Sequence, residues 1–192
     1  AYLEWLARAP YATLPRAEKL AHLVNAYNAF AIEGILEGSS PSSFFGRIGY
    51  FKTDEYTLGG SPVTLHELEH EIIIPLDEPR VHFAINCASA SCPVLRSGAY
   101  VADRLHLQLD EAARRFVNDQ TRNRFDRETR TAYLSRIFDW YEDDFLRHAD
   151  SVLAYVARYV DDSALASELA AGGWEIEFLD YDWGLNGIPP ES

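Results

Sequence analysis

The sequence has little positive charge, few cysteines and no methionine. Lys and Arg together number 17, against 30 Asp and Glu, and the formal net charge at pH 7 is −13. Binding of nucleic acid needs a basic surface that neutralises phosphates, so this balance argues against a nucleic-acid partner. No apolar run is long enough to cross a bilayer, so no membrane-spanning segment is predicted.

The length of 192 residues fits one domain with a sizeable core, and we expect residues 1–192 to form a single domain. The chain begins at Ala1 and has no Met, which suggests a processed or excised chain whose signal peptide, if any, is out of view. Its two cysteines indicate neither a redox compartment nor an oligomeric state.

Hydrophobic periodicity predicts an α+β fold, with several helices packed around a small, mostly antiparallel sheet. The clearest helix covers residues 16–38, where apolar side chains recur at helical spacing. A small hairpin or an extended arm is expected around Gly59-Gly60. Further helices are predicted at 2–8, 64–74, 103–118, 135–145, 151–160 and 163–171, and further strands at 81–86, 132–134 and 174–179.

The segment 80–100 holds both cysteines and carries the densest chemistry of the chain. Val81, Phe83 and Ile85 alternate with more polar residues, which predicts a short strand with His82 and Asn86 on one face. A loop of small residues follows from Cys87 to Cys92 and includes Ser89 and Ser91. Small residues let a backbone approach a ligand closely, or simply allow a tight turn.

Four interpretations of the two cysteines remain open. One is a cysteine nucleophile with a histidine partner. Another is a zinc site that combines Cys87 and Cys92 with two of His66, His70 and His82, although the C-x4-C spacing is wider than usual. A third is a structural disulfide. The last is a pair of inert, buried small residues.

Residues 66–70 read HELEH and match the H-E-x-x-H pattern of zinc proteases. Thr64 and Glu67 also have the spacing of a capping box, which gives Glu67 a structural purpose. No third ligand follows at a suitable spacing, so the metal interpretation is weak. Glu69 falls on the apolar stripe of the predicted helix, where a carboxylate needs a partner, and His70 or His82 would supply one.

Five motifs occur together and in order: NAYNAF at 25–30, LHELEH at 65–70, RVHFAINCASASCPVL at 80–95, SRIFDWYEDDF at 135–145 and YDWGLN at 181–186. In this combination the chain resembles the DUF547 family, whose function is unassigned, over nearly its whole length from Tyr2 to Asn186. The resemblance implies one domain. It marks eight motif positions: Asn25, Asn28, Glu69, His70, His82, Cys87, Cys92 and Asn186.

The resemblance also implies that bacterial members are often exported, which weakly favours an exported or periplasmic location. In plants the domain is attached to coiled-coil regions, and some members lack parts of the Cys/His set. The family is distantly similar to papain- and transglutaminase-like Cys/His folds, but here the histidines precede the cysteines, which requires a rearranged connection. A likeness of fold cannot establish activity.

The leading hypothesis is a thiol-dependent acyl transferase or amide hydrolase, or a degenerate relative, without a cofactor. Cys87 would be the nucleophile, with Cys92 as the second choice; His82 or His70 would be the base, oriented by Glu69 or an asparagine. The substrate would be a small peptide-like, γ-glutamyl-type or thiol-containing molecule. Candidate binding groups, some of them for an oxyanion, are Asn25, Asn28, Asn86, Ser89, Ser91, Asn186 and the backbone amides of 87–91.

Two alternatives belong to other classes. The first is a non-catalytic module that binds a ligand or a protein and has a loop stapled by a Cys87–Cys92 disulfide. The second is a metal site made from cysteines and histidines. Thiol reactivity and metal content distinguish the three.

Overall fold

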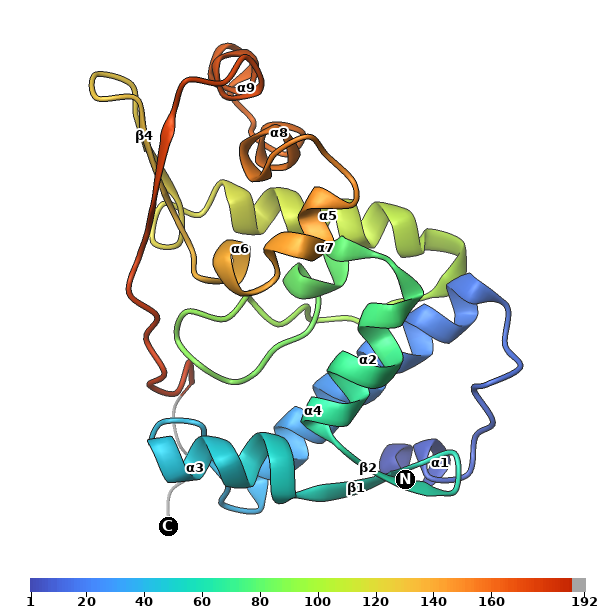
Figure 1. Ribbon diagram of the computed structural model, residues 1–192. Coiled ribbons are helices and arrows are strands. Elements are labelled where there is room, and N and C mark those ends of the chain that lie inside the picture. The colour runs from blue at the N-terminus through green and yellow to red at the C-terminus, as the bar shows by residue number, and fades with distance from the viewer. Residues whose placement is uncertain (188–192) are drawn as a thin grey trace.

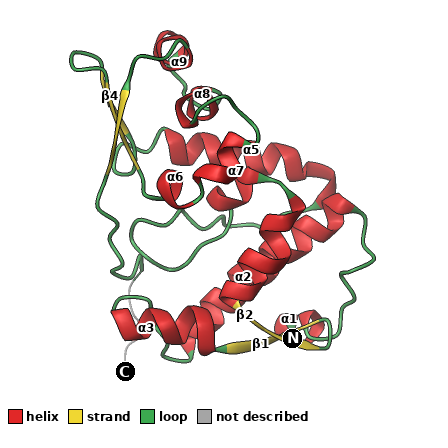
Figure 2. Ribbon diagram, in the orientation of Figure 1, coloured by secondary structure: helices red, strands yellow, loops and turns green. Residues whose placement is uncertain are grey.

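The computed structural model describes residues 1–187, and helices of all kinds make up about half of it (Figures 1 and 2). The α-helices are α1 (Tyr2–Leu6), α2 (Arg16–Leu36), α3 (Phe44–Ile48), α4 (Leu65–Glu67), α5 (Leu105–Val117), α6 (Ile137–Trp140), α7 (Glu142–Leu146), α8 (Val152–Ala157) and α9 (Ser163–Ala170). Two π-helical segments are η1 (Gly49–Thr53) and η2 (Leu68–Ile73). Three 3-10 segments are η3 (Ile74–Leu76), η4 (Pro79–Phe83) and η5 (Ala102–Arg104).

The strands form two small sheets. β1 (Glu55–Leu58) and β2 (Ser61–Thr64) form an antiparallel hairpin, as predicted. Gly59 and Gly60 turn it with φ values of 58° and 91°, which glycine adopts at little cost. In the second sheet, β4 (Thr131–Leu134) lies between β3 (Arg124–Asp126), which is antiparallel to it, and β5 (Glu175–Phe178), which is parallel to it. The predicted α+β class with a mostly antiparallel sheet is confirmed.

Two clusters of buried apolar side chains underlie this architecture. The first packs α1, α2, the β1–β2 hairpin and α4 together, in the lower part of Figure 1. The second lies among α5 to α9 and β4, in the upper part. The segment from Val81 to Ile85 joins them, because Val81, Ala84 and Ile85 pack in the first cluster and Phe83 in the second. We propose that both clusters belong to one domain; residues 188–192 of the predicted domain lie outside the described residues.

The predicted strand at 81–86 is wrong, since residues 79–83 form the 3-10 segment η4. Pro79 occupies its first turn, and the Glu78 side chain accepts a hydrogen bond from the Arg80 backbone N–H. Proline at the start of a helical turn fixes φ at a helical value. Val81 therefore packs in the first apolar cluster and Phe83 in the second, and they do not share one face of a sheet.

Other expectations about local structure had mixed outcomes. The capping box of Thr64 and Glu67 is present, and α4 continues directly into η2. The helix predicted at 103–118 begins as the 3-10 segment η5, which runs directly into α5 at Leu105. The helix α3 was not predicted, although Ser43 caps it by accepting a hydrogen bond from Gly46 N–H. Within residues 1–187, none of the helices has the length and hydropathy required to cross a membrane.

Candidate functional site

The two cysteine sulfurs lie in contact at the start and end of a tight loop. Their Sγ atoms are 2.6 Å apart, and both residues are free cysteines. The backbone N–H of Cys87 also donates to Cys92 Sγ at 2.8 Å. Ala88 has a φ of 63°, in the left-handed region that non-glycine residues rarely adopt. This strained turn folds the short loop back and brings residue 92 onto residue 87.

Cys87 is surrounded by hydrogen-bond donors. Its Sγ lies 3.0 Å from Ser89 Oγ and 3.4 Å from Tyr181 Oη, in addition to its contact with Cys92. Burial acts to raise the pKa of the Cys87 thiol, but the hydrogen bonds from Cys92, Ser89 and Tyr181 outweigh it and lower the pKa to about 7. Hydrogen bonds to the charged form favour that form. Cys87 can therefore be substantially ionised at neutral pH.

Cys92 lies behind it and is 3% exposed. Burial, followed by the hydrogen bond to Cys87 and the charge of that neighbour, raises the pKa of the Cys92 thiol well above its usual value. Arg122 holds this end of the loop, because its guanidinium donates to the carbonyl oxygens of Ala90 and Cys92 and also pairs with Asp119. The two thiols thus differ in access and in acidity.

His82 is buried and is oriented by a carboxylate. Its Nε2 lies 2.7 Å from Asp144 Oδ2, and its ring stacks on Tyr141 with centroids 3.9 Å apart. Burial acts to raise the pKa of Asp144, but the hydrogen bond and charge of His82, together with Arg147, lower it. Among residues 1–187, nothing forms a hydrogen bond with the other ring nitrogen, Nδ1. A buried polar atom without a partner needs an explanation, and Nδ1 is the ring nitrogen of His82 that no described group uses.

Glu69 is also buried, at 7% exposure, but the histidines are not its partners as predicted. Its carboxylate accepts hydrogen bonds from two tyrosines instead, Tyr27 at 3.2 Å and Tyr141 at a shorter distance. Both phenol pKa values are raised by burial and then by the charge of Glu69. Tyr141 therefore links Glu69 to His82, since it donates to the first and stacks on the second.

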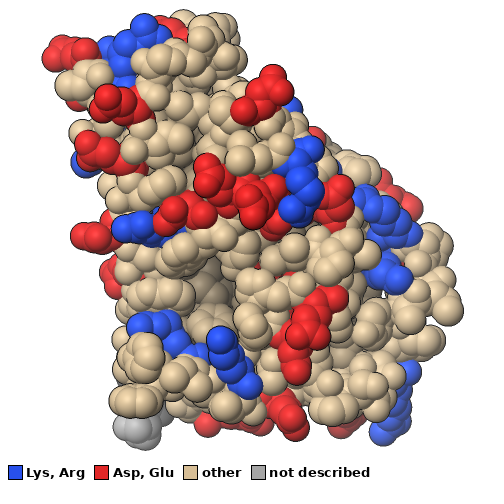
Figure 3. Space-filling view, in the orientation of Figure 1, with Lys and Arg blue, Asp and Glu red and all other residues tan. Residues whose placement is uncertain are grey.

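One pocket of about 70 Å³ contains both sulfurs, His82 and Glu69. Aromatic rings form much of its wall: Trp140 and Trp183 stack with centroids 5.7 Å apart, and Tyr181 lies between 4.6 and 4.7 Å from each. Figure 3 shows that this face is hollowed between α3 and α6, below a band of acidic side chains. The remaining lining residues are Tyr27, Phe51, Ile85, Pro93, Ile137 and Tyr141.

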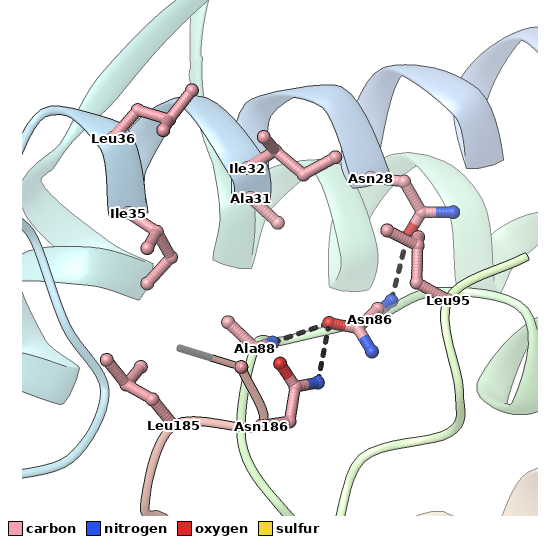
Figure 4. A pocket seen from close by; sticks show the side chains of 11 residues that line it. Asn28, Ala31, Ile32, Ile35, Leu36, Asn86, Ala88, Leu95, Leu185 and Asn186 are labelled. Carbon is pink, nitrogen blue, oxygen red and sulfur yellow. Dashed lines mark hydrogen bonds between the residues drawn. The ribbon is translucent and has the colours of Figure 1, made fainter. Parts of the chain in front are cut away.

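A second pocket, of about 170 Å³, is lined by α2, the loop at 86–88 and the segment at 185–187 (Figure 4). Its walls are apolar, with Ile32, Ile35 and Leu185 among them. Asn86 and Asn186 form its polar floor, where Asn86 Oδ1 accepts hydrogen bonds from Ala88 N–H and, at 3.4 Å, from Asn186 Nδ2. Ala88 lines this pocket and its neighbour Cys87 lines the other, so the loop separates the two.

The asparagines of α2 bridge this helix to the rest of the chain. Asn28 Nδ2 donates to the Ala84 carbonyl and its Oδ1 accepts from Asn86 N–H, both within the buried interior. Asn25 makes the same two-way contact with the backbone of Tyr100. Asn25 lies outside the linings of both pockets, whereas Asn28 contributes to the larger one. A direct binding role remains a prediction for Asn28.

We expect Asn28→Ala to lower the free energy of unfolding by roughly 2–4 kcal/mol, because Ala84 O and Asn86 N–H would be left buried without partners. Urea denaturation followed by circular dichroism measures this. Asn25→Ala is the matched control, with two similar bonds at a part-buried position, and a smaller loss is expected there. Equal stability of Asn28→Ala and the unmodified protein would contradict the bridging role.

The structure does not place His70 with the other histidine of the candidate set. His70 is exposed and lies outside the lining of the cysteine pocket, and its ring contacts His66 at a centroid distance of 4.3 Å. Within residues 1–187, no group of three or more His, Cys, Asp or Glu side chains is arranged to hold a metal ion. The H-E-x-x-H residues therefore form no such group, whereas His70 as a base remains a prediction; its ring stacks on Tyr141, with centroids 6.2 Å apart.

The loop amides form hydrogen bonds within the protein, and a role for them in holding an oxyanion remains a prediction. Ser89 Oγ lies 2.9 Å from Tyr181 Oη beside Cys87, while Ser91 Oγ accepts a hydrogen bond from Asp182 N–H. Asn86 Nδ2 donates to the Pro93 carbonyl. Each backbone N–H from residue 87 to residue 92 donates to an acceptor within the protein. Taken in the order of the donors, the acceptors are Cys92 Sγ, Asn86 Oδ1, Cys87 Sγ, Gly184 O, Asp182 O and Ser89 O.

Sequence reasoning missed Asp144, Tyr141, Trp140 and Tyr181 as members of the site. All four lie in the aromatic motifs at 135–145 and 181–186. The signal that could have found Asp144 is weak, because it follows Glu142 and Asp143 in a run of acidic residues. Only the fold shows which of these carboxylates reaches His82.

Comparison with known proteins gives a family but no activity. A family model described as "Protein of unknown function, DUF547" matches residues 11–117. This span includes Glu69, His82 and both cysteines, and it ends before Asp144. No curated protein and no solved structure matches the chain. Because the matched span covers more than half of the sequence, the chain belongs to the DUF547 family, a family of unknown function.

Proposed function

We propose that this protein is a thiol-dependent enzyme that transfers or hydrolyses an acyl group, with Cys87 as the nucleophile and His82 as the base. One observation carries the proposal. Cys87 and His82 line the same pocket, and the Nε2 atom of His82 is held by Asp144. A nucleophile, a base and a group that orients the base are the parts that this chemistry requires.

In the first step the Cys87 thiolate attacks the substrate carbonyl. The new C–S bond forms, the bond from the carbonyl carbon to the leaving group breaks, and the leaving group takes a proton from the imidazolium of His82. The donors around Cys87 Sγ stabilise the thiolate before it reacts. The proton that the Cys87 thiol loses is the one that His82 Nδ1 carries as an imidazolium and then gives to the leaving group.

In the second step His82 Nδ1 accepts a proton from water, or from another acceptor molecule, as that molecule attacks the thioester. The C–S bond breaks and the Cys87 thiolate returns. Asp144 fixes the proton of the imidazole on Nε2 and so leaves Nδ1 as the accepting atom. Within residues 1–187, His82 Nδ1 has no hydrogen-bond partner, so its lone pair is not already used by another group.

The pocket favours a small substrate that carries an amino group. Its volume of about 70 Å³ accommodates only a small part of a molecule, and the aromatic side chains of Trp140 and Tyr181 offer a flat apolar wall. Glu69 places a buried carboxylate in the same pocket. A peptide-like or γ-glutamyl-type amide has a planar scissile group and a nearby ammonium, and it matches both features.

The pH dependence of alkylation tests the nucleophile. We expect iodoacetamide to modify Cys87 selectively in the reduced native protein, with a rate that rises with pH around a midpoint near the pKa of about 7 and then levels. An ordinary thiol has its midpoint near pH 8.5. Mass spectrometry of the labelled peptide gives the rate at each site.

Tyr181→Phe is the accompanying variant. It removes one donor to the Cys87 sulfur, so its alkylation midpoint should move to higher pH. A midpoint near 8.5 in the unmodified protein, or equal modification of Cys87 and Cys92, would argue against an activated nucleophile.

A second candidate function is binding without turnover, and the apolar pocket beside α2 favours it. This pocket is the larger of the two, and its polar floor at Asn86 and Asn186 suits a ligand with an aliphatic body and one hydrogen-bonding end. If a ligand of this kind binds the Cys87→Ala variant as it binds the unmodified protein, but does not bind the Ile32→Asp variant, the result would support this function.

A further inference from the structure

We propose that Cys87 and Cys92 form a reversible dithiol–disulfide couple that exchanges with low-molecular-weight disulfides, with Cys87 as the attacking thiol and Cys92 as the resolving thiol. The two Sγ atoms are 2.6 Å apart, which is closer than two non-bonded sulfur atoms normally approach. The backbone is already folded for the bond, since Cys87 N–H reaches Cys92 Sγ. Oxidation therefore needs little movement of the loop.

The two cysteines differ in the way that such a couple requires. Cys87 is half-buried and lines the pocket, so an incoming disulfide can reach it. Cys92 is 3% exposed, so an incoming disulfide reaches it much less readily than it reaches Cys87. The donors Ser89 and Tyr181 face the sulfur of Cys87 and favour the thiolate, which is the attacking species.

The exchange balances in two steps. The Cys87 thiolate attacks one sulfur of R–S–S–R, forms a mixed disulfide with R–S and releases one R–S⁻, which takes a proton from solvent. Cys92 then loses its proton to solvent and attacks Cys87 Sγ; the Cys87–Cys92 bond forms and a second R–S⁻ leaves. The protein is oxidised by two electrons, and one small disulfide is reduced to two thiols.

This inference depends on the reactivity of Cys87 but not on acyl transfer. If both proposals hold, oxidation removes the nucleophile and switches the enzyme off until a thiol reduces the bond. The strained turn at Ala88 and the clamp of Arg122 on Cys92 hold the two sulfurs in place through the cycle.

Oxidised glutathione, added to the reduced native protein, is the probe, and intact mass with peptide mapping is the readout. We expect the unmodified protein to lose two hydrogens, to join Cys87 with Cys92 and to carry no lasting adduct. Cys92→Ser should instead keep one glutathione on Cys87, because nothing resolves the mixed disulfide. Cys87→Ser should gain neither, since the remaining thiol is buried. Dithiothreitol should restore the starting mass in each case.

The unmodified protein alone can overturn the proposal. A lasting glutathione adduct, or two thiols that stay reduced in oxidised glutathione while alkylation shows Cys87 to be accessible, would do so. The denatured chain is the control, because its two thiols should react without order. Acyl transfer is tested separately in Cys92→Ser under reducing conditions, where no intramolecular disulfide can form, so failure of one proposal is distinguishable from failure of the other.

Discussion

Replacing Cys87 by alanine is expected to reduce turnover of a small amide or thioester by at least about 10³-fold, because the covalent route through the thioester is lost. Removal of a nucleophile leaves only what binding and electrostatics provide. The assay uses a panel of chromogenic peptidyl and γ-glutamyl amides with the reduced protein. Rapid quenching followed by mass spectrometry should show an acyl group on Cys87 in the unmodified protein.

Cys92→Ser is the matched control for this experiment. It changes the other sulfur of the same loop, keeps the nucleophile and leaves a hydroxyl that can still donate to Cys87 Sγ. We expect it to retain turnover with a pH profile close to that of the unmodified protein. The nucleophile assignment would fail if Cys87→Ala turned over an identified substrate at the original rate, or if the acyl group appeared on Cys92.

Asp144→Asn is expected to slow turnover by roughly 10²–10⁴-fold, the range found when a base loses the group that orients it. An amide accepts a hydrogen bond less strongly than a carboxylate and can rotate its NH₂ towards Nε2, which favours the wrong tautomer of His82. Asp144 is a positioning residue in this scheme, because it contacts the base. Steady-state kinetics with the same panel measures the loss.

A second measurement distinguishes action of Asp144 through His82 from a purely structural role of Asp144. If Asp144 acts through His82, the step that suffers most is attack of water on the thioester, so Asp144→Asn should accumulate acyl-enzyme while alkylation of Cys87 stays fast. Asp143→Asn, at an exposed neighbouring position, is the matched control and should behave as the unmodified protein. Loss of Cys87 alkylation together with turnover would indicate collapse of the site and contradict the assigned role.

The sequence was informative where chemistry and local rules coincide. The capping box at Thr64 and Glu67 depends on residues three apart, and it forms as expected. The grouping of Glu69, His82 and the two cysteines also appears in the structure, in one pocket. The capping box could be predicted because its residues are close in the sequence, and the site could be predicted because cysteine is rare in this chain and chemically reactive.

Long-range contacts explain what the sequence could not show. The partner of His82 lies 62 positions later in the chain, and nothing in a run of acidic residues distinguishes Asp144 from Asp143. The partners of Glu69 are tyrosines rather than the adjacent histidine, because η2 turns His70 outward. Apolar and other residues alternate at 81–85 as they would in a strand. The reason is that side chains on opposite sides of this segment, which includes η4, pack in two separate apolar clusters.

The placement of η4 has a mechanical consequence. Its residue Phe83 is anchored among the helices of the C-terminal half, while Val81 and Ile85 are anchored on the side of α2. His82 lies between these anchors, and its Nε2 atom is hydrogen-bonded to the carboxylate of Asp144 in α7, on the C-terminal side. A hinge movement of one half against the other would therefore shift the imidazole relative to the sulfurs. Substitutions far from the pocket that change the spacing of the two halves should then alter the proton-transfer distance.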